Sequence, residues 1–216
     1  MRKILLMTLL LIVAGGNAMG QETRTRGTYL NLNYVSSTMK FEGNSSKLKS
    51  DYGAALTIGH TFNLHKKPIL GLIRIGIDCT YFDLNFAKSS YDTEGYSDGS
   101  GWEAENVNVY KAEVGMQVGP SIKITPVKGL SASVYYRYAP SYSGYYDDEV
   151  EEFKGGYGSY SVLGLSVAYK VIAIGVENRW GTTKLNIDSE DSDGKTVTNK
   201  MKLKTSGPRL YVGFRF

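Results

Sequence analysis

The chain has 216 residues, 42% of them hydrophobic, and a formal net charge of +4 at pH 7. Its single cysteine, Cys79, excludes an intramolecular disulfide, and the small net charge gives no indication of nucleic-acid binding. The 17 tyrosines and 25 glycines are many for a helical protein and are typical of β-strands, aromatic girdles and tight turns.

The N-terminus has the features of a secretory signal peptide. A basic pair precedes the apolar run Ile4–Val13, which is too short to span a bilayer, and small residues at the two recognition positions predict cleavage before Gln21. We therefore expect a signal peptide at 1–20 and one mature domain at 21–216. That domain contains no apolar run long enough for a transmembrane helix.

Eight segments of the mature domain alternate apolar and polar residues with a period of two. They lie at about 30–34, 52–62, 69–81, 110–118, 130–138, 162–169, 172–180 and 209–216. Single-chain bacterial membrane barrels have an even number of strands. The predicted fold class is therefore all-β, an eight-stranded antiparallel up-and-down transmembrane β-barrel.

The polar faces of these segments distinguish a membrane barrel from a soluble sandwich. A sandwich buries its apolar face, whereas a small membrane barrel turns that face to lipid and its polar face inward. Opposite charges share a face here, as in Arg74 with Asp78 and Glu177 with Arg179, and small residues lie between them. This mixture predicts a narrow, charged interior. The residues expected in its charge network are Arg74, Asp78, Lys111, Glu113, Arg137, Glu177, Arg179 and Arg209. Its surplus positive charge would need tyrosine hydroxyls such as Tyr135 and Tyr211, trapped water or a bound anion.

The connections between segments alternate in length. The long ones are 39–51, 83–106, 139–156 and 185–200, and the short ones are 63–68, 125–129 and 169–171. Long outer loops alternate with short periplasmic turns in transmembrane barrels. The long connections carry 17 acidic and 7 basic residues. We therefore expect four acidic loops outside the cell, around Asn44, Ser97, Asp147 and Asp191, and both termini in the periplasm.

The long connections are also rich in tyrosine, with Tyr91, Tyr96, Tyr142, Tyr145 and Tyr146. Exposed tyrosines form recognition surfaces in some proteins and an upper aromatic girdle in membrane barrels. The sequence leaves both interpretations open, and with them an extracellular ligand on the loops.

The last segment alternates apolar residues and ends in phenylalanine, at Leu210, Val212, Phe214 and Phe216. It resembles the signal that delivers outer-membrane proteins to the barrel-assembly machinery. The eight-strand plan, with the segments Val118–Ser121 and Arg179–Asn186, resembles the OmpX-like and OmpA-barrel-like families within the general porin family of outer-membrane β-barrels. The resemblance implies the outer membrane of a Gram-negative bacterium, with membrane lipid and lipopolysaccharide as partners.

Residues that would indicate an enzyme are few. Both histidines, His60 and His65, are expected near the periplasmic end, and no serine lies two residues from His60 to form a nucleophile–base pair. The acidic run Asp188–Gly194 lacks the alternate-position ligands and the closing glutamate of an EF-hand calcium loop. We therefore predict no catalytic residues, no metal site and no cofactor.

Two functions fit this architecture. A structural or surface-interaction protein would display its loops from a closed barrel, and a small porin or transporter would pass solutes or ions. An eight-stranded barrel has an interior only just wide enough for its own side chains. This favours the closed barrel, while the family resemblance supports the porin alternative.

Overall fold

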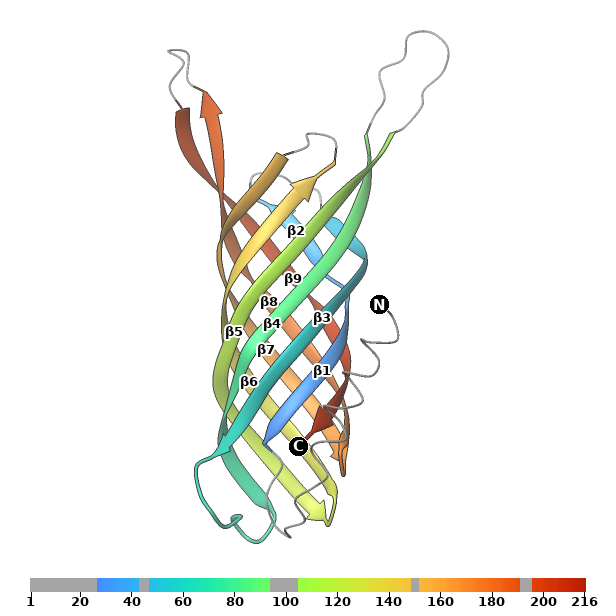
Figure 1. Ribbon diagram of the computed structural model, residues 1–216, viewed down its shortest axis with the longest axis vertical. Coiled ribbons are helices and arrows are strands. Elements are labelled where there is room, and N and C mark those ends of the chain that lie inside the picture. The colour runs from blue at the N-terminus through green and yellow to red at the C-terminus, as the bar shows by residue number, and fades with distance from the viewer. Residues whose placement is uncertain (1–26, 43–46, 94–104, 149–151, 191–195) are drawn as a thin grey trace, which may run out of the picture.

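The computed structural model describes residues 27–42, 47–93, 105–148, 152–190 and 196–216, which form one antiparallel sheet closed into a barrel (Figure 1). Its strands are β1 Thr28–Val35, β2 Thr38–Phe41, β3 Leu48–Asn63, β4 Ile73–Thr93, β5 Glu105–Val127, β6 Leu130–Asp147, β7 Glu152–Tyr169, β8 Ile172–Glu190 and β9 Thr196–Arg215. The predicted signal peptide at 1–20 lies outside the described residues. Nowhere in the described ranges does a helix have the length and apolarity needed to cross a membrane.

The nine strands form a ring of eight. Both β1 and β2 pair with β3 on one side and with β9 on the other, so they are one barrel strand interrupted at Ser36 and Ser37. Every pairing is antiparallel, and the remaining strands pair with their neighbours in sequence. This topology confirms the predicted eight-stranded up-and-down barrel.

The strands are strongly staggered. Following paired residues once around the ring from Asn31 leads back to the first barrel strand at Phe41, ten residues farther along. A stagger of this kind accompanies strands tilted by roughly 35–45° to the barrel axis. With eight such strands the interior has room for side chains and little else.

The wall has the polarity of a membrane barrel. On β5, for example, Val114 is 45% exposed on the outside whereas the neighbouring Glu113 is 2% exposed on the inside. The outward face carries a broad apolar band of large hydrophobic side chains. Exposed aromatic residues lie at its two edges, including Tyr34, Tyr52, Tyr142 and Trp180 at one edge and Phe62 and Tyr169 at the other. This is the aromatic-girdle pattern of barrels that span a bilayer.

Several strands continue well beyond the apolar band, so the predicted long loops are wrong in extent. β4 runs to Thr93 and β5 begins at Glu105, which makes most of 83–106 a paired hairpin. The hairpins β4–β5 and β8–β9 project farthest, at the end opposite the short turns (Figure 1). Outward positions here are polar, as at Lys184 and Asn186. Outward apolar residues therefore end at the edge of the apolar band, although the strands continue beyond it. The loop positions Asn44, Ser97 and Asp191, and also Tyr96, lie outside the described residues.

A β-bulge in β4 changes which residues face inward. The pairing with β5 shifts between Thr80 and Asp83, so that Tyr81 and Phe82 both face outward. Beyond the bulge, Asp83 and Asn85 are buried in the interior. Asp83 was predicted to lie in a loop, because a strict period of two has no position for the extra residue that a bulge inserts.

Candidate functional site: the closed interior of the barrel

The barrel interior contains eight buried charged side chains in the described residues. The basic ones are Lys111, Arg137, Arg179 and Arg209, and the acidic ones are Asp78, Asp83, Glu113 and Glu177. Each is at most 6% exposed, and the two signs are equal in number. An unpaired buried charge costs several kcal/mol, so this balance makes a charged interior compatible with folding.

Glu113 is the centre of the upper group of charges. Its carboxylate lies 2.9 Å from the Lys111 ammonium and also binds Arg179. The Tyr160 hydroxyl donates to the same carboxylate at 2.5 Å, and Lys111 donates to Thr205 Oγ1 at 2.7 Å. Strands β5, β7 and β8 thus meet at one carboxylate, β9 joins the group through Lys111, and the group holds one acid and two bases.

Arg137 is the centre of the lower group. Its guanidinium lies 3.1 Å from the Asp78 carboxylate and 3.2 Å from that of Glu177. Each carboxylate also accepts from a buried tyrosine, Asp78 from the Tyr29 hydroxyl at 2.6 Å and Glu177 from that of Tyr135 at 2.7 Å. The two tyrosines thereby add neutral donors to a site that holds more acids than bases.

Gln117 connects this group to a third ion pair. Its amide oxygen accepts from Arg137 at 3.0 Å, and its amide nitrogen donates to Asp83 at 2.8 Å. Asp83 in turn lies 3.1 Å from Arg209. The lower group therefore has three acids and two bases, a net −1, which offsets the +1 of the upper group. We call the two groups together the charge network.

Glycines make room for the tyrosine rings of the network. A Cβ at Gly164 would lie 2.2 Å from the Tyr135 ring, and one at Gly181 would lie 2.5 Å from the Tyr160 ring. Arginines stack on the other side of these rings, with Arg137 3.8 Å from the Tyr135 centroid and Arg179 3.7 Å from that of Tyr160. The network is therefore closely packed as well as charge-balanced. The sequence indicates this packing by glycines at inward positions of one strand, opposite tyrosines at inward positions of the neighbouring strand.

Above the charge network the interior becomes apolar. Met39, Val109, Tyr145, Leu185 and Leu203 form a cluster in which no side chain is more than 5% exposed. We call it the apolar plug. Phe41, Leu48, Tyr91 and Met201 pack against it. Burial raises the pKa of the Tyr145 phenol, and the nearby Asp147 carboxylate raises it further.

The eight residues predicted for the charge network have two different positions in the structure. Seven of the eight predicted network residues are buried in the charge network, whereas Arg74 donates to the Lys66 carbonyl at 3.3 Å at the other end of β4. The expected Arg74–Asp78 pair is therefore wrong, because Asp78 pairs instead with Arg137 of β6, which only β5 separates from β4. Asp83 was missed as a network member.

The C-terminal residues and the loop tyrosines also have definite positions. Leu210 and Val212 face outward in the apolar band, and the Phe216 amide donates to the Thr28 carbonyl at 2.9 Å. Tyr142 and Tyr146 lie on the outer wall, where Tyr142 packs edge-to-face on Tyr157. Tyr145 differs from both sequence interpretations, since it is buried inside the plug.

The histidines hold structural contacts near the short turns. His60 Nδ1 lies 2.9 Å from Thr28 Oγ1, and His65 Nε2 accepts from the Ile75 amide at 3.0 Å. Within the described ranges, no group of three or more His, Cys, Asp or Glu side chains is arranged to hold a metal ion.

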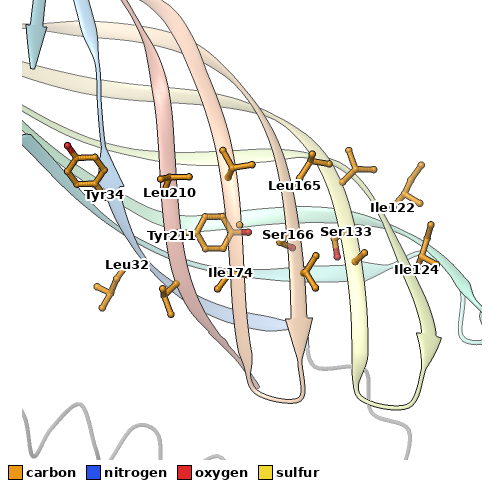
Figure 2. A pocket seen from close by; sticks show the side chains of 16 residues that line it. Leu32, Tyr34, Ile122, Ile124, Ser133, Leu165, Ser166, Ile174, Leu210 and Tyr211 are labelled. Atoms are coloured by element: carbon orange, nitrogen blue, oxygen red, sulfur yellow. The ribbon is translucent and has the colours of Figure 1, made fainter.

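One hollow lies on the outer wall of the barrel. Figure 2 shows this hollow of about 870 Å³, with Leu32, Ile124, Leu165, Ile174 and Leu210 among its lining residues. Its lining is mostly apolar and belongs to the band described above. In a bilayer, this surface would face lipid acyl chains.

Comparison with known proteins gives neighbours in structure but none in sequence. The sequence matches no protein-family model, and no curated protein is significantly similar to it. Among solved structures, Neisserial surface protein A is similar at 12% identity and a TM-score of 0.49, covering 88% of this chain and 97% of that one. Ail of Yersinia pestis is similar at 11% identity and 0.43, covering 89% and 100%. The Escherichia coli outer-membrane protease OmpT is similar at 9% identity and 0.45, covering 88% and 94%.

Proposed function

We propose that residues 21–216 form an integral outer-membrane protein of a Gram-negative bacterium, with a closed barrel and a structural or surface-interaction role. Export by the signal peptide at 1–20 and assembly through the C-terminal strand belong to the same proposal. The apolar band supports the membrane location, because a soluble protein rarely exposes so large a continuous apolar surface.

One observation carries the closed-barrel function: two different layers fill the interior in succession. A permeating ion would first have to displace paired charges, such as Glu113 with Arg179, which are at most 6% exposed. It would then meet the apolar plug, where four of the five buried side chains are apolar and offer water no hydrogen-bond partner. Neither layer offers a continuous polar path along the barrel axis.

The display role is supported by the strands that extend past the apolar band. The β4–β5 and β8–β9 hairpins are paired far beyond the last outward hydrophobic residues and project from one end of the barrel (Figure 1). The plug gives this extension a core of its own. A rigid, filled rim is suited to holding surface loops in fixed positions.

Single-channel recording tests the closed barrel directly. The refolded 21–216 chain, inserted in a planar bilayer, should show no unitary current steps above the leak of the lipid alone. Regular current steps would establish the porin or transporter alternative. Deletion of Phe216 in cells tests the location, and it should lower the amount of folded barrel in the outer membrane.

A further inference from the structure

Exposed lysines gather on the outer wall where β8, β9, β2 and the start of β3 leave the apolar band. They are Lys40, Lys47, Lys49, Lys184, Lys202 and Lys204. We call this surface the lysine patch. Glu42 contributes one carboxylate, 3.1 Å from Lys202 in a pair that is about half exposed on each side. The patch therefore keeps a strong positive charge.

The strand register places like charges directly opposite one another in this patch. Lys40 on β2 pairs with Lys204 on β9, and Lys184 on β8 pairs with Lys202 on the same β9 strand. Like charges opposite each other on one face of a sheet are destabilising. The fully buried charges of the interior are equal in number of each sign. In the described part of the lysine patch the two opposed pairs face a single carboxylate, that of Glu42, and an anion bound between the lysines would offset their repulsion.

A hollow of about 550 Å³ lies within the patch. Side chains that carry ammonium or hydroxyl groups line it together with the apolar ring of Trp180; the polar ones include Lys40, Lys47, Lys204, Thr38, Thr182 and Ser206. Lysine ammonium groups only donate hydrogen bonds, and they bind phosphate oxygens as point charges. Hydroxyls both donate and accept, as the hydroxyls of a sugar require. The lining is therefore complementary to a phosphorylated sugar.

Two of the strands that carry the lysine patch, β8 and β9, also line the apolar hollow of Figure 2. Along β9, outward Lys202 and Lys204 are followed by outward Leu210 and Val212. On β8 the same change separates Lys184 from Ile174, which is labelled in Figure 2 beside Leu210. Trp180 lines the basic hollow and stands between the two surfaces. A ligand that meets both surfaces must have anionic and apolar parts in this order.

We propose that the lysine patch binds the phosphorylated sugar headgroup of an outer-leaflet glycolipid of the lipopolysaccharide class, whose acyl chains lie along the apolar hollow. The inference rests on the proposed membrane location and names one lipid and one face of the barrel. Binding places phosphates between opposed lysines and so removes their repulsion. At the level of the lysine patch it leaves the outer wall of β6 and β7, with exposed Tyr142, Tyr157 and Phe153, free of the headgroup.

The test uses the refolded chain in nonionic-detergent micelles and diphosphoryl lipid A as the probe. Wild type should bind diphosphoryl lipid A at least tenfold more tightly than its dephosphorylated form. The variant Lys40→Gln/Lys204→Gln should lose that preference, while Lys40→Arg/Lys204→Arg should retain it. The control Lys66→Gln/Lys67→Gln removes the same charge from a short turn at the opposite end and should bind as wild type.

A second readout separates binding from folding. Without anionic lipid, Lys40→Gln/Lys204→Gln should unfold at the same or a higher temperature than wild type, because the repulsion is gone. With diphosphoryl lipid A, wild type should gain more thermal stability than this variant. Equal lipid A binding by wild type and variant overturns the proposal, and so does equally strong competition by soluble pyrophosphate. A barrel that conducts ions yet shows the expected lipid preference would refute the closed barrel and retain this inference, while a chain that stays soluble without detergent refutes the membrane location itself.

Discussion

The charge network and the apolar plug fill the same barrel with opposite chemistry. β9 shows the change within one strand: Arg209 faces inward and Leu210 outward, whereas a few residues earlier Leu203 faces inward and Lys204 outward. Where the outer wall meets lipid, apolar residues lie outside, and the interior is left to polar side chains. Where the wall meets water, the strands return to the polarity of a soluble protein.

One strand with alternating side chains can therefore be built for lipid along one part of its length and for water along another. Apart from the β-bulges, the alternation continues along the strands, and its two faces exchange polarity at the level of Trp180 and Tyr142. The two layers should therefore respond differently to substitution. Removing one partner of a buried ion pair leaves an unpaired charge in a dry site, whereas truncating a side chain of the plug leaves a cavity.

The largest effect is expected in the charge network, from Glu113→Gln. The glutamine keeps the shape of the side chain but leaves Lys111 and Arg179 without their shared carboxylate. Removing one partner of a buried ion pair costs about 3–5 kcal/mol, and we expect a loss of that order in the unfolding free energy. Urea unfolding of the barrel in phosphatidylcholine vesicles measures it.

An exposed ion pair provides the matched control for that substitution. Glu42→Gln removes the same charge from a pair with Lys202, in which both side chains are about half exposed. Exposed pairs contribute about 0–1 kcal/mol, so this variant should unfold close to wild type. If Glu113→Gln were as mild as Glu42→Gln, water would reach the network and the closed interior would be refuted.

The apolar plug should respond to Leu203→Ala with a smaller loss. Leu203 is fully buried among Val109, Leu185 and Tyr145, and truncation of a buried leucine costs about 2–5 kcal/mol, less where neighbours collapse into the space. Phe41 and Met201 pack against the cluster and are placed to do so. We expect a loss near the lower end of that range.

Conductance of the same variant separates the two layers. Leu203→Ala alone should remain closed in planar bilayers, because the charge network below is intact. Current steps should appear only when the plug and the network are weakened together, as in Leu203→Ala with Arg179→Ala and Glu113→Ala. Current through the single variant would mean that the plug alone closes the barrel.

The packing inside the charge network gives a third prediction. Gly164→Ala places a Cβ 2.2 Å from the Tyr135 ring, and overpacking of this kind costs about 1–3 kcal/mol. Tyr135→Ala in the same chain should relieve the clash, so the double variant should lose less than the sum of the two single losses. Simple additivity, measured in the same urea assay, would show that the ring and the glycine do not share the space.

The sequence predicted the ring of eight strands and seven network residues because the membrane keeps the alternation strict inside the apolar band. Lys111, Glu113 and Glu177 all stand in segments where outward positions are apolar. The ion-pair partners could not be predicted, since Arg137 on β6 meets Asp78 on β4 across the intervening strand β5, and no spacing in the chain indicates that register. For the same reason the sequence could not show that Asp78 pairs with Arg137 rather than with Arg74.

Asp83 and the apolar plug were missed for two other reasons. The bulge before Asp83 breaks the period by one residue, and no local residue type announces it. The plug residues Val109, Leu185 and Leu203 stand in stretches whose outward positions are polar. Leu185 was therefore predicted in the loop 185–200, and Val109 and Leu203 were left outside both strands and loops, although a strand that continues with its polarity exchanged produces the same pattern.

The smallest effect is expected from the Tyr145 hydroxyl and appears only at high pH. In the folded barrel burial raises the pKa of Tyr145 above its ordinary value of 10.0, with Asp147 and Tyr91 adding to the shift. Above pH 10 the unfolded chain therefore loses the proton first, and stability falls as pH rises, by up to about 1.4 kcal/mol per pH unit from this group. Tyr145→Phe should change stability by about 1 kcal/mol or less at neutral pH and should flatten the decline above pH 10. Tyr142→Phe, on a tyrosine that is 42% exposed, is the matched control and should keep the wild-type slope. Parallel slopes for wild type and Tyr145→Phe would mean that the phenol ionises as readily in the folded barrel as in the unfolded chain, which a dry plug does not allow.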